Sequence, residues 1–109
     1  MSLNGVKVLV EVNGEVQVPL VMNHSKANVT DVDSIIIPAN AERKYLLIVN
    51  NSDTDMIINL GNIITEDKGI PLNAGANYQI SKDYLFAGEV HAIHKATGMT
   101  KTLDITEGV

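Results

Sequence analysis

Five consecutive apolar residues at positions 45–49, Tyr-Leu-Leu-Ile-Val, constrain the fold more than any other stretch of the chain. The run is rich in residue types that favour strands, and it predicts a central strand buried on both faces. A second apolar run at positions 56–60, Met-Ile-Ile-Asn-Leu, follows after the six polar residues 50–55. This spacing predicts that the two strands lie side by side as an antiparallel pair.

Short apolar runs separated by turn-forming residues recur along the whole chain. Clusters of Gly, Asn, Asp and Pro interrupt them about every eight to twelve residues, a pattern typical of an antiparallel β-sandwich or small barrel. No window has a convincing helical period. We therefore predict an all-β fold of seven to nine short strands in a single domain, residues 1–109. The pattern divides this domain into an N-terminal hairpin (1–22), a connecting loop (23–33) and the main sandwich (34–109).

The N-terminal hairpin is predicted from alternation and from one turn signal. Residues 6–12 alternate between apolar and polar types, and Asn13-Gly14 follows them. A two-residue loop would pair valines with polar residues, whereas a three-residue loop pairs valine with valine, as in Val10 opposite Val16. A slip of one residue reverses every side chain of a strand. We therefore expect the three-residue loop, with Gly14 in the left-handed region.

Two segments 33 positions apart repeat the same residues at the same spacing. Residues 37–41 and 70–74 share Ile, Pro, Asn and Ala, and Tyr45 and Tyr78 follow them at equal distances. Each segment resembles a strand end stopped by proline, then a polar turn, then a new strand. The repeat predicts two equivalent corners of a sandwich, and an internal duplication remains the alternative.

Composition excludes several kinds of site and favours an aliphatic core. The chain has no cysteine, so disulfides, iron–sulfur clusters and thiolate zinc sites are ruled out. It has no tryptophan, three tyrosines and one phenylalanine, so the core must consist of Val, Ile and Leu. The aromatic group at residues 84–86, Tyr-Leu-Phe, is interpreted as a core plug beneath a loop.

Charge argues against several classes of partner. The net charge is −5, and the eight basic residues are scattered, with Arg43-Lys44 as their only adjacent pair. Nucleic-acid binding and docking to an anionic membrane both need clustered basic residues, so we expect neither. No apolar run reaches membrane-spanning length. Lys7 and Glu11 interrupt the only apolar stretch near the N-terminus, so we expect no signal peptide and folding in the cytoplasm.

The histidines do not form a predicted metal site. His91 and His94 are three residues apart, so on one strand they point to opposite faces, and His24 lies in a distant segment. We expect these histidines to be structural or solvated.

One acidic segment has the spacing that opens a calcium loop. Asn51, Asp53 and Asp55 alternate, but the sixth place is Met56 where the motif needs glycine, and the glutamate at position twelve is missing. A polar hairpin loop is the better interpretation.

Catalytic motifs are also missing from the sequence. It contains no nucleophile elbow and no glycine-rich phosphate loop. The remaining acidic residues are interpreted as ordinary solubilising charge, and we predict no catalytic, cofactor-binding or metal-binding residues and no cofactor. The acidic residues considered for paired acid–base roles are Glu66, Asp67, Asp83, Glu89 and Asp104.

From Arg43 onward the order of these signals resembles small structural proteins of tailed-bacteriophage virions, of the accessory, head-fibre or tail type. The similar segments include residues 46–52, 58–61, 69–75, 88–93 and 103–108. Residues 1–42 take no part in the resemblance. It implies a non-enzymatic role in an assembled particle, and it supplies no catalytic residues.

The resemblance and the chemistry lead to one expected function and one alternative. We expect a bacteriophage virion structural or decoration protein that acts through protein–protein contacts with other virion proteins. It would be located in the virion, after assembly in the host cytoplasm. Because residues 45–49 have no polar face, we expect a homo-oligomer, with a trimer as the arrangement that the resemblance implies. The alternative is a phage module that binds a host-surface protein or carbohydrate.

Overall fold

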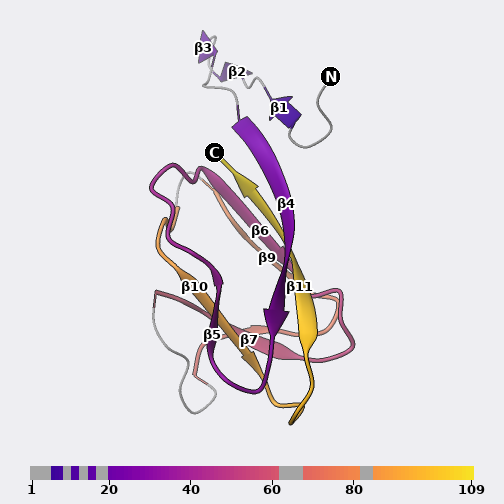
Figure 1. Cartoon of the computed structure of the whole chain (residues 1–109). Coiled ribbons are helices and arrows are strands. Elements are labelled where there is room, and N and C mark those ends of the chain that lie inside the picture. Colours follow the sequence, from indigo (N-terminus) through magenta and orange to yellow (C-terminus); the bar gives the residue numbers. More distant parts are fainter. Residues whose placement is uncertain (1–5, 9–10, 13–14, 17–19, 62–67, 82–84) are drawn as a thin grey trace.

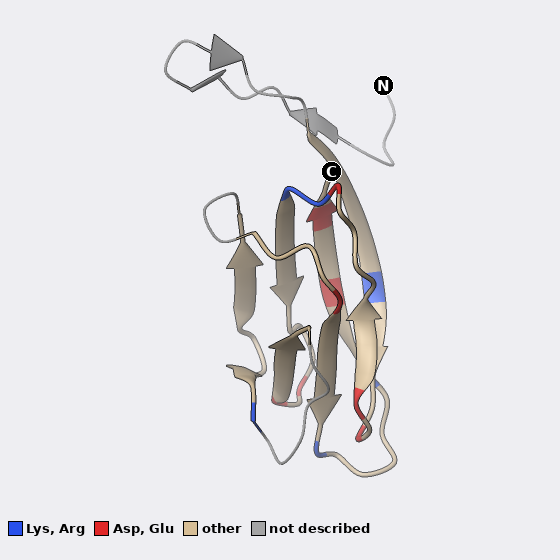
Figure 2. Ribbon diagram, turned by 90° about the vertical axis from the view of Figure 1, so that its left-hand side faces the viewer, with Lys and Arg blue, Asp and Glu red and all other residues tan. Residues whose placement is uncertain are grey.

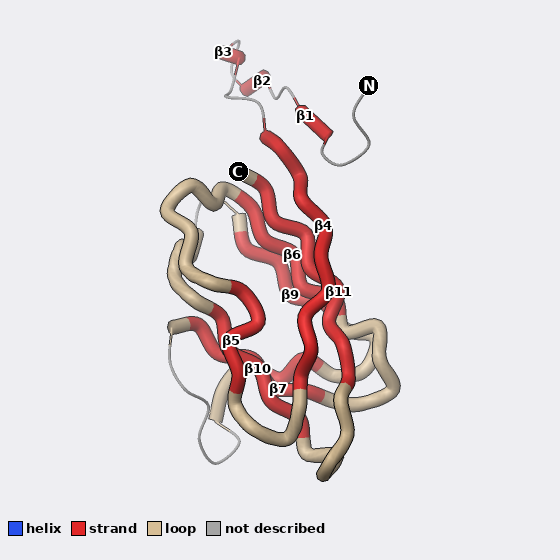
Figure 3. Tube along the Cα trace, in the orientation of Figure 1, coloured by secondary structure: helices blue, strands red, loops and turns tan. Residues whose placement is uncertain are grey.

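Eight strands, β4 to β11, form a two-layered β-sandwich (Figure 1). The computed structural model describes residues 6–8, 11–12, 15–16, 20–61, 68–81 and 85–109. These residues form strands, loops and turns (Figure 3). They contain no helix, and therefore no helix that could span a membrane. The all-β prediction is confirmed. The strands are β4 (Leu20–Val29), β5 (Ser34–Ile37), β6 (Tyr45–Val49), β7 (Met56–Leu60), β8 (Ile70–Leu72), β9 (Asn77–Ile80), β10 (Val90–His94) and β11 (Lys101–Gly108).

The strand order of the sandwich is that of a jelly roll. One sheet has the order β4-β11-β6-β9 and the other has the order β5-β10-β7-β8, and neighbouring strands in both are antiparallel. The chain changes sheets at every connection between successive strands except β7 to β8. Eight strands wound in this way into two sheets define the jelly-roll architecture.

The core between the sheets is aliphatic, as the composition predicts. Alternate residues of each strand point inward, so period-two patterning builds the core. Tyr78 and Phe86 pack against its margin, which agrees with the predicted plug for Phe86. Tyr84 lies outside the described residues, and Leu85 is exposed. The buried apolar residues are Val29, Ile36, Ile37, Leu46, Ile48, Met56, Ile58, Leu72, Ile80, Val90, Ala92, Leu103 and Ile105.

The predicted pairing of residues 45–49 with residues 56–60 is wrong. β6 pairs with β11 and β9, whereas β7 pairs with β10 and β8 in the opposite sheet. The connection between them, residues 50–55, crosses the sandwich and is not a hairpin. β6 also has only one fully buried face, because Leu46 and Ile48 are completely covered while the alternate residues are half-buried. Two apolar runs separated by a short polar loop fit a crossover as well as a hairpin.

The predicted connecting loop, residues 23–33, is also wrong for most of its length. Residues 20–29 form β4, which pairs with β11 from Met22 to Val29. Residues 23–26 of β4 are exposed and polar, so the segment lacks the apolar alternation by which a strand is recognised. Backbone pairing with β11 holds this strand, and only residues 30–33 form a loop.

The N-terminal segment contains three further short strands, β1 (Val6–Val8), β2 (Glu11–Val12) and β3 (Glu15–Val16). β1 pairs with the start of β4, where Val8 lies opposite Leu20. β2 and β3 form the predicted hairpin, but Glu11 lies opposite Val16 and Val12 opposite Glu15. The loop is therefore the two-residue one, and the predicted three-residue register is wrong. The conformation of Gly14 lies outside the described residues.

The repeated segments do form equivalent corners of the sandwich. Both connect the β5-β10-β7-β8 sheet to the other sheet, one from β5 to β6 and the other from β8 to β9. In each corner the backbone carbonyl of the asparagine accepts a hydrogen bond from the backbone N–H three residues later. Asn40 accepts from Arg43 at 3.1 Å, and Asn73 accepts from Ala76 at 2.8 Å. The strands that they open, β6 and β9, then pair with each other.

Candidate contact surface

The outer face of the β5-β10-β7-β8 sheet is the strongest candidate for a functional surface. None of its four strands contains Lys, Arg, Asp or Glu, whereas β4 and β11 in the other sheet contain four such residues (Figure 2). On this outer face Ile93 of β10 lies opposite Ile57 of β7, and Ile57 lies opposite Pro71 of β8. A row of apolar side chains therefore crosses three strands on the side away from the core.

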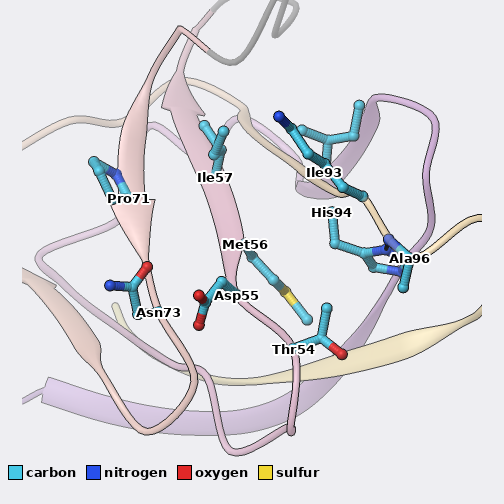
Figure 4. Close-up of a pocket in the computed structure, with 10 residues that line it drawn as sticks. Thr54, Asp55, Met56, Ile57, Pro71, Asn73, Ile93, His94 and Ala96 are labelled. Atoms are coloured by element: carbon cyan, nitrogen blue, oxygen red, sulfur yellow. Dashed lines mark hydrogen bonds between the residues drawn. The ribbon is translucent and has the colours of Figure 1, made fainter.

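This row of apolar side chains lines a pocket of about 430 Å³. Figure 4 shows Pro71, Ile57 and Ile93 from adjacent strands along one side of the pocket, with Thr54 and Asp55 at another side. Apolar surfaces with a few polar groups are typical of binding pockets of this size. The full lining is Thr54, Asp55, Met56, Ile57, Pro71, Asn73, Ile93, His94, Lys95 and Ala96.

Two exposed apolar residues lie at the β5 edge of the same sheet. Ile35 is 54% exposed and lies opposite His91 in the register, so both belong to the outer face. Val32, in the loop before β5, is 66% exposed. The outer face thus combines an apolar pocket around β7 with apolar side chains that project at β5.

His91 lies on this face between two carboxylates. Its Nδ1 is 2.8 Å from Oδ2 of Asp33, and its Nε2 is 2.9 Å from Oε1 of Glu89. Each ring nitrogen faces a carboxylate oxygen, an arrangement that favours the imidazolium ion, in which both nitrogens donate. Burial lowers the pKa of His91, but the hydrogen bonds to Asp33 and Glu89 and their charges outweigh it, so the pKa is raised above 6.5.

His94 points into the core, on the opposite face from His91, as strand alternation predicts. Its Nε2–H donates to the Val29 carbonyl at 2.9 Å, and its Nδ1 accepts from the Ala96 N–H at 3.0 Å. Both ring nitrogens therefore join β10 to neighbouring segments. His24 lies on β4, where its Nδ1 is 2.9 Å from the Thr106 hydroxyl.

Residues 50–55, which include the alternating acidic segment, are organised by the Asn50 side chain. The Asn50 side chain is fully buried, and its amide donates to the carbonyls of Thr54 and Leu72, each at 2.8 Å. Asp53 instead pairs with Lys101, and Asp55 accepts from the Ala74 N–H, so the two carboxylates do not converge. Within the described residues no group of three or more His, Asp or Glu side chains is arranged to hold a metal ion.

The acidic residues considered for acid–base chemistry are dispersed. Glu89 pairs with His91, and Asp104 pairs with Lys26 across β11 and β4. Glu66, Asp67 and Asp83 lie outside the described residues. The sequence did not predict the pocket or the His91 cluster, which consists of Asp33, Glu89 and His91. For the pocket there was one usable signal, because strand alternation places Ile57 of β7 and Ile93 of β10 on the face away from the core.

Comparison of the chain with models of known protein families, with curated proteins and with solved structures found no match.

Proposed function

We propose that this chain is a non-enzymatic structural or decoration protein of a bacteriophage virion, which binds other virion proteins through the outer face of the β5-β10-β7-β8 sheet. One observation carries the proposal, namely an outer sheet face whose strands lack Lys, Arg, Asp and Glu and which is hollowed by an apolar pocket. Centres of protein interfaces are depleted of charged residues and enriched in apolar contact. The resemblance of residues 43–109 to virion proteins agrees with such a role.

The fold is compatible with the proposal. Jelly rolls occur in viral capsid proteins, in lectins and in cupins, so the architecture alone does not assign a function. The alternative, binding of a host-surface protein or carbohydrate, is less favoured by the pocket, because its lining contains no Trp, Tyr or Phe on which a sugar ring would stack.

The proposed setting is the assembled virion, with assembly in the host cytoplasm and a homo-oligomer as the working unit. The resemblance implies a trimer. A net charge of −5 makes the phosphate backbone of packaged DNA an unfavourable partner, so the proposed contacts are with proteins.

Binding to purified particles tests the proposed function. The tagged chain is incubated with phage heads, phage tails or host cell walls, and bound protein is measured after sedimentation. We expect wild type to bind heads or tails, Ile93→Lys and Pro71→Glu to lose at least ten-fold in affinity, and the control His24→Lys on the other sheet to bind like wild type. Circular dichroism checks that each variant is folded. Binding to cell walls alone would overturn the proposal in favour of the alternative.

A further inference from the structure

We infer that the pocket on the outer face receives Ile35 of a second copy of the same chain. The inference rests on the proposed function, because it takes this face to be the surface through which the chain contacts protein. It adds the identity of one partner and the residues that meet.

The projecting half of the contact is Ile35, supported by Val32. They are the two most exposed of the large apolar side chains in the described part of the chain, at 54% and 66%. Ile35 lies near the middle of β5. β5 is an edge strand, so no further strand of this sheet lies beyond it. Covering such side chains with protein removes apolar surface from water, which favours association.

The receiving half of the contact is the pocket, which lies on the same face but too far from Ile35 of the same copy for that side chain to fill it. Its centre is β7, and β10 separates β7 from β5 in the sheet. Neighbouring strands are about 4.8 Å apart, so β5 and β7 are separated by roughly 10 Å. The Ile35 side chain therefore does not fill the pocket of its own chain, whereas a neighbouring copy can present it there.

A second copy fits this face better than an unrelated partner because the face carries both halves of the contact. A surface that carries both a projection and a hollow can pair reciprocally in a dimer, or head to tail in a ring or an open filament, depending on the rotation between copies. The β5, β7, β8 and β10 strands would bring no unpaired formal charge into the contact, and His91 is already paired with Asp33 and Glu89. The pocket lining itself holds one acidic and one basic side chain, Asp55 and Lys95, so the contact would cover no net formal charge there, and Asp55 already accepts a hydrogen bond from the Ala74 N–H.

The absence of cysteine makes a site-directed cross-link the sharpest test. Ile35→Cys and Pro71→Cys chains carrying different tags are mixed, then oxidised or treated with a short bis-thiol reagent. We expect the mixed product to form at least ten-fold faster than in a control that pairs Ile35→Cys with Gln79→Cys, an exposed position on the other sheet. If Ile35→Cys fails to fold, Val32→Cys in the preceding loop replaces it. A rate equal to the control would overturn the inference.

Two outcomes separate this inference from the proposed function. If the cross-link fails while wild type still binds phage particles, the inference that a second copy fills the pocket is wrong and the proposed function stands. If the cross-link forms while wild type binds no particle, the contact between copies stands and the virion role falls.

Discussion

Nε of Arg43 donates to Oε2 of Glu107 at 2.7 Å, and the Arg43 side chain has no exposed surface. Its Nη1 donates to the carbonyls of Phe86 and Gly88 at 2.7 and 2.9 Å, and its Nη2 donates to the Pro38 carbonyl at 2.8 Å. One guanidinium therefore joins the β5–β6 corner, the segment before β10, and β11. The planar donor fork of arginine suits such convergent acceptors, which the ammonium of lysine does not match.

Arg43→Met is expected to lower the free energy of unfolding by about 3–5 kcal/mol, because it removes the buried cation that pairs with Glu107 and donates to three backbone carbonyls. Urea denaturation followed by circular dichroism measures the change. The matched control is Lys44→Met at the neighbouring exposed position, for which we expect a change within about 0.5 kcal/mol. A loss below about 1 kcal/mol for Arg43→Met would show that the carbonyls find other donors.

Asn50→Asp is expected to cost about 2 kcal/mol or more, although it is nearly isosteric. The substitution replaces the amide that donates to Thr54 and Leu72 with an oxygen that repels both carbonyls. Thermal unfolding of this variant is compared with that of Asn51→Asp, where the side chain is exposed. Equal melting temperatures for the two variants would contradict the organising role assigned to Asn50.

The His91 cluster predicts a stability that depends on pH. The pKa of His91 is raised above 6.5 in the folded chain, so folding binds a proton there. Its contribution is fully present below pH 6.5 and is lost as the pH rises through the raised pKa. Asp33→Asn removes one partner, and we expect it to lower the His91 pKa measured by NMR and to weaken this pH dependence.

His24→Gln provides the control for that titration, because His24 is exposed on β4. It should leave the decrease of stability above pH 6.5 as in wild type. A wild-type stability that is constant or rises over this range would contradict the assigned imidazolium.

Hydrogen exchange tests the assignment of residues 23–28 to β4. These residues pair with β11 on one side, and within the described part of the chain no strand lies on their other side. Alternate amides should therefore be protected and the intervening ones should exchange quickly. Fast exchange at every position from 23 to 28 would instead support the connecting loop predicted from the sequence.

Fold class and core follow from local patterning, whereas strand partners do not. Continuous apolar runs identify β6 and β7, and aliphatic composition indicates the nature of the core. A polar connection of six residues carries no information on whether the chain turns within a sheet or crosses to the other one. β4 was missed because its stability comes from backbone pairing with β11, and its exposed residues 23–26 carry no apolar signal.

The candidate surface was hidden from sequence reasoning because it depends on long-range placement. Ile57 and Ile93 come together with Pro71 only through the register of three strands. The ion pair between Asp33 and His91 spans 58 positions, with Asp33 in the loop before β5 and His91 in β10. The opposite orientation of His91 and His94, by contrast, needed only the strand period of two.

The claim that the outer face of the β5-β10-β7-β8 sheet is covered by another copy is tested most directly by sedimentation velocity over a wide range of concentration. For wild type we expect reversible association that strengthens with added salt, because salt screens the repulsion between copies of net charge −5. Ile57→Glu, which places a charge in the pocket, should sediment as a monomer. A wild type that stays monomeric at every concentration and salt level would contradict the claim.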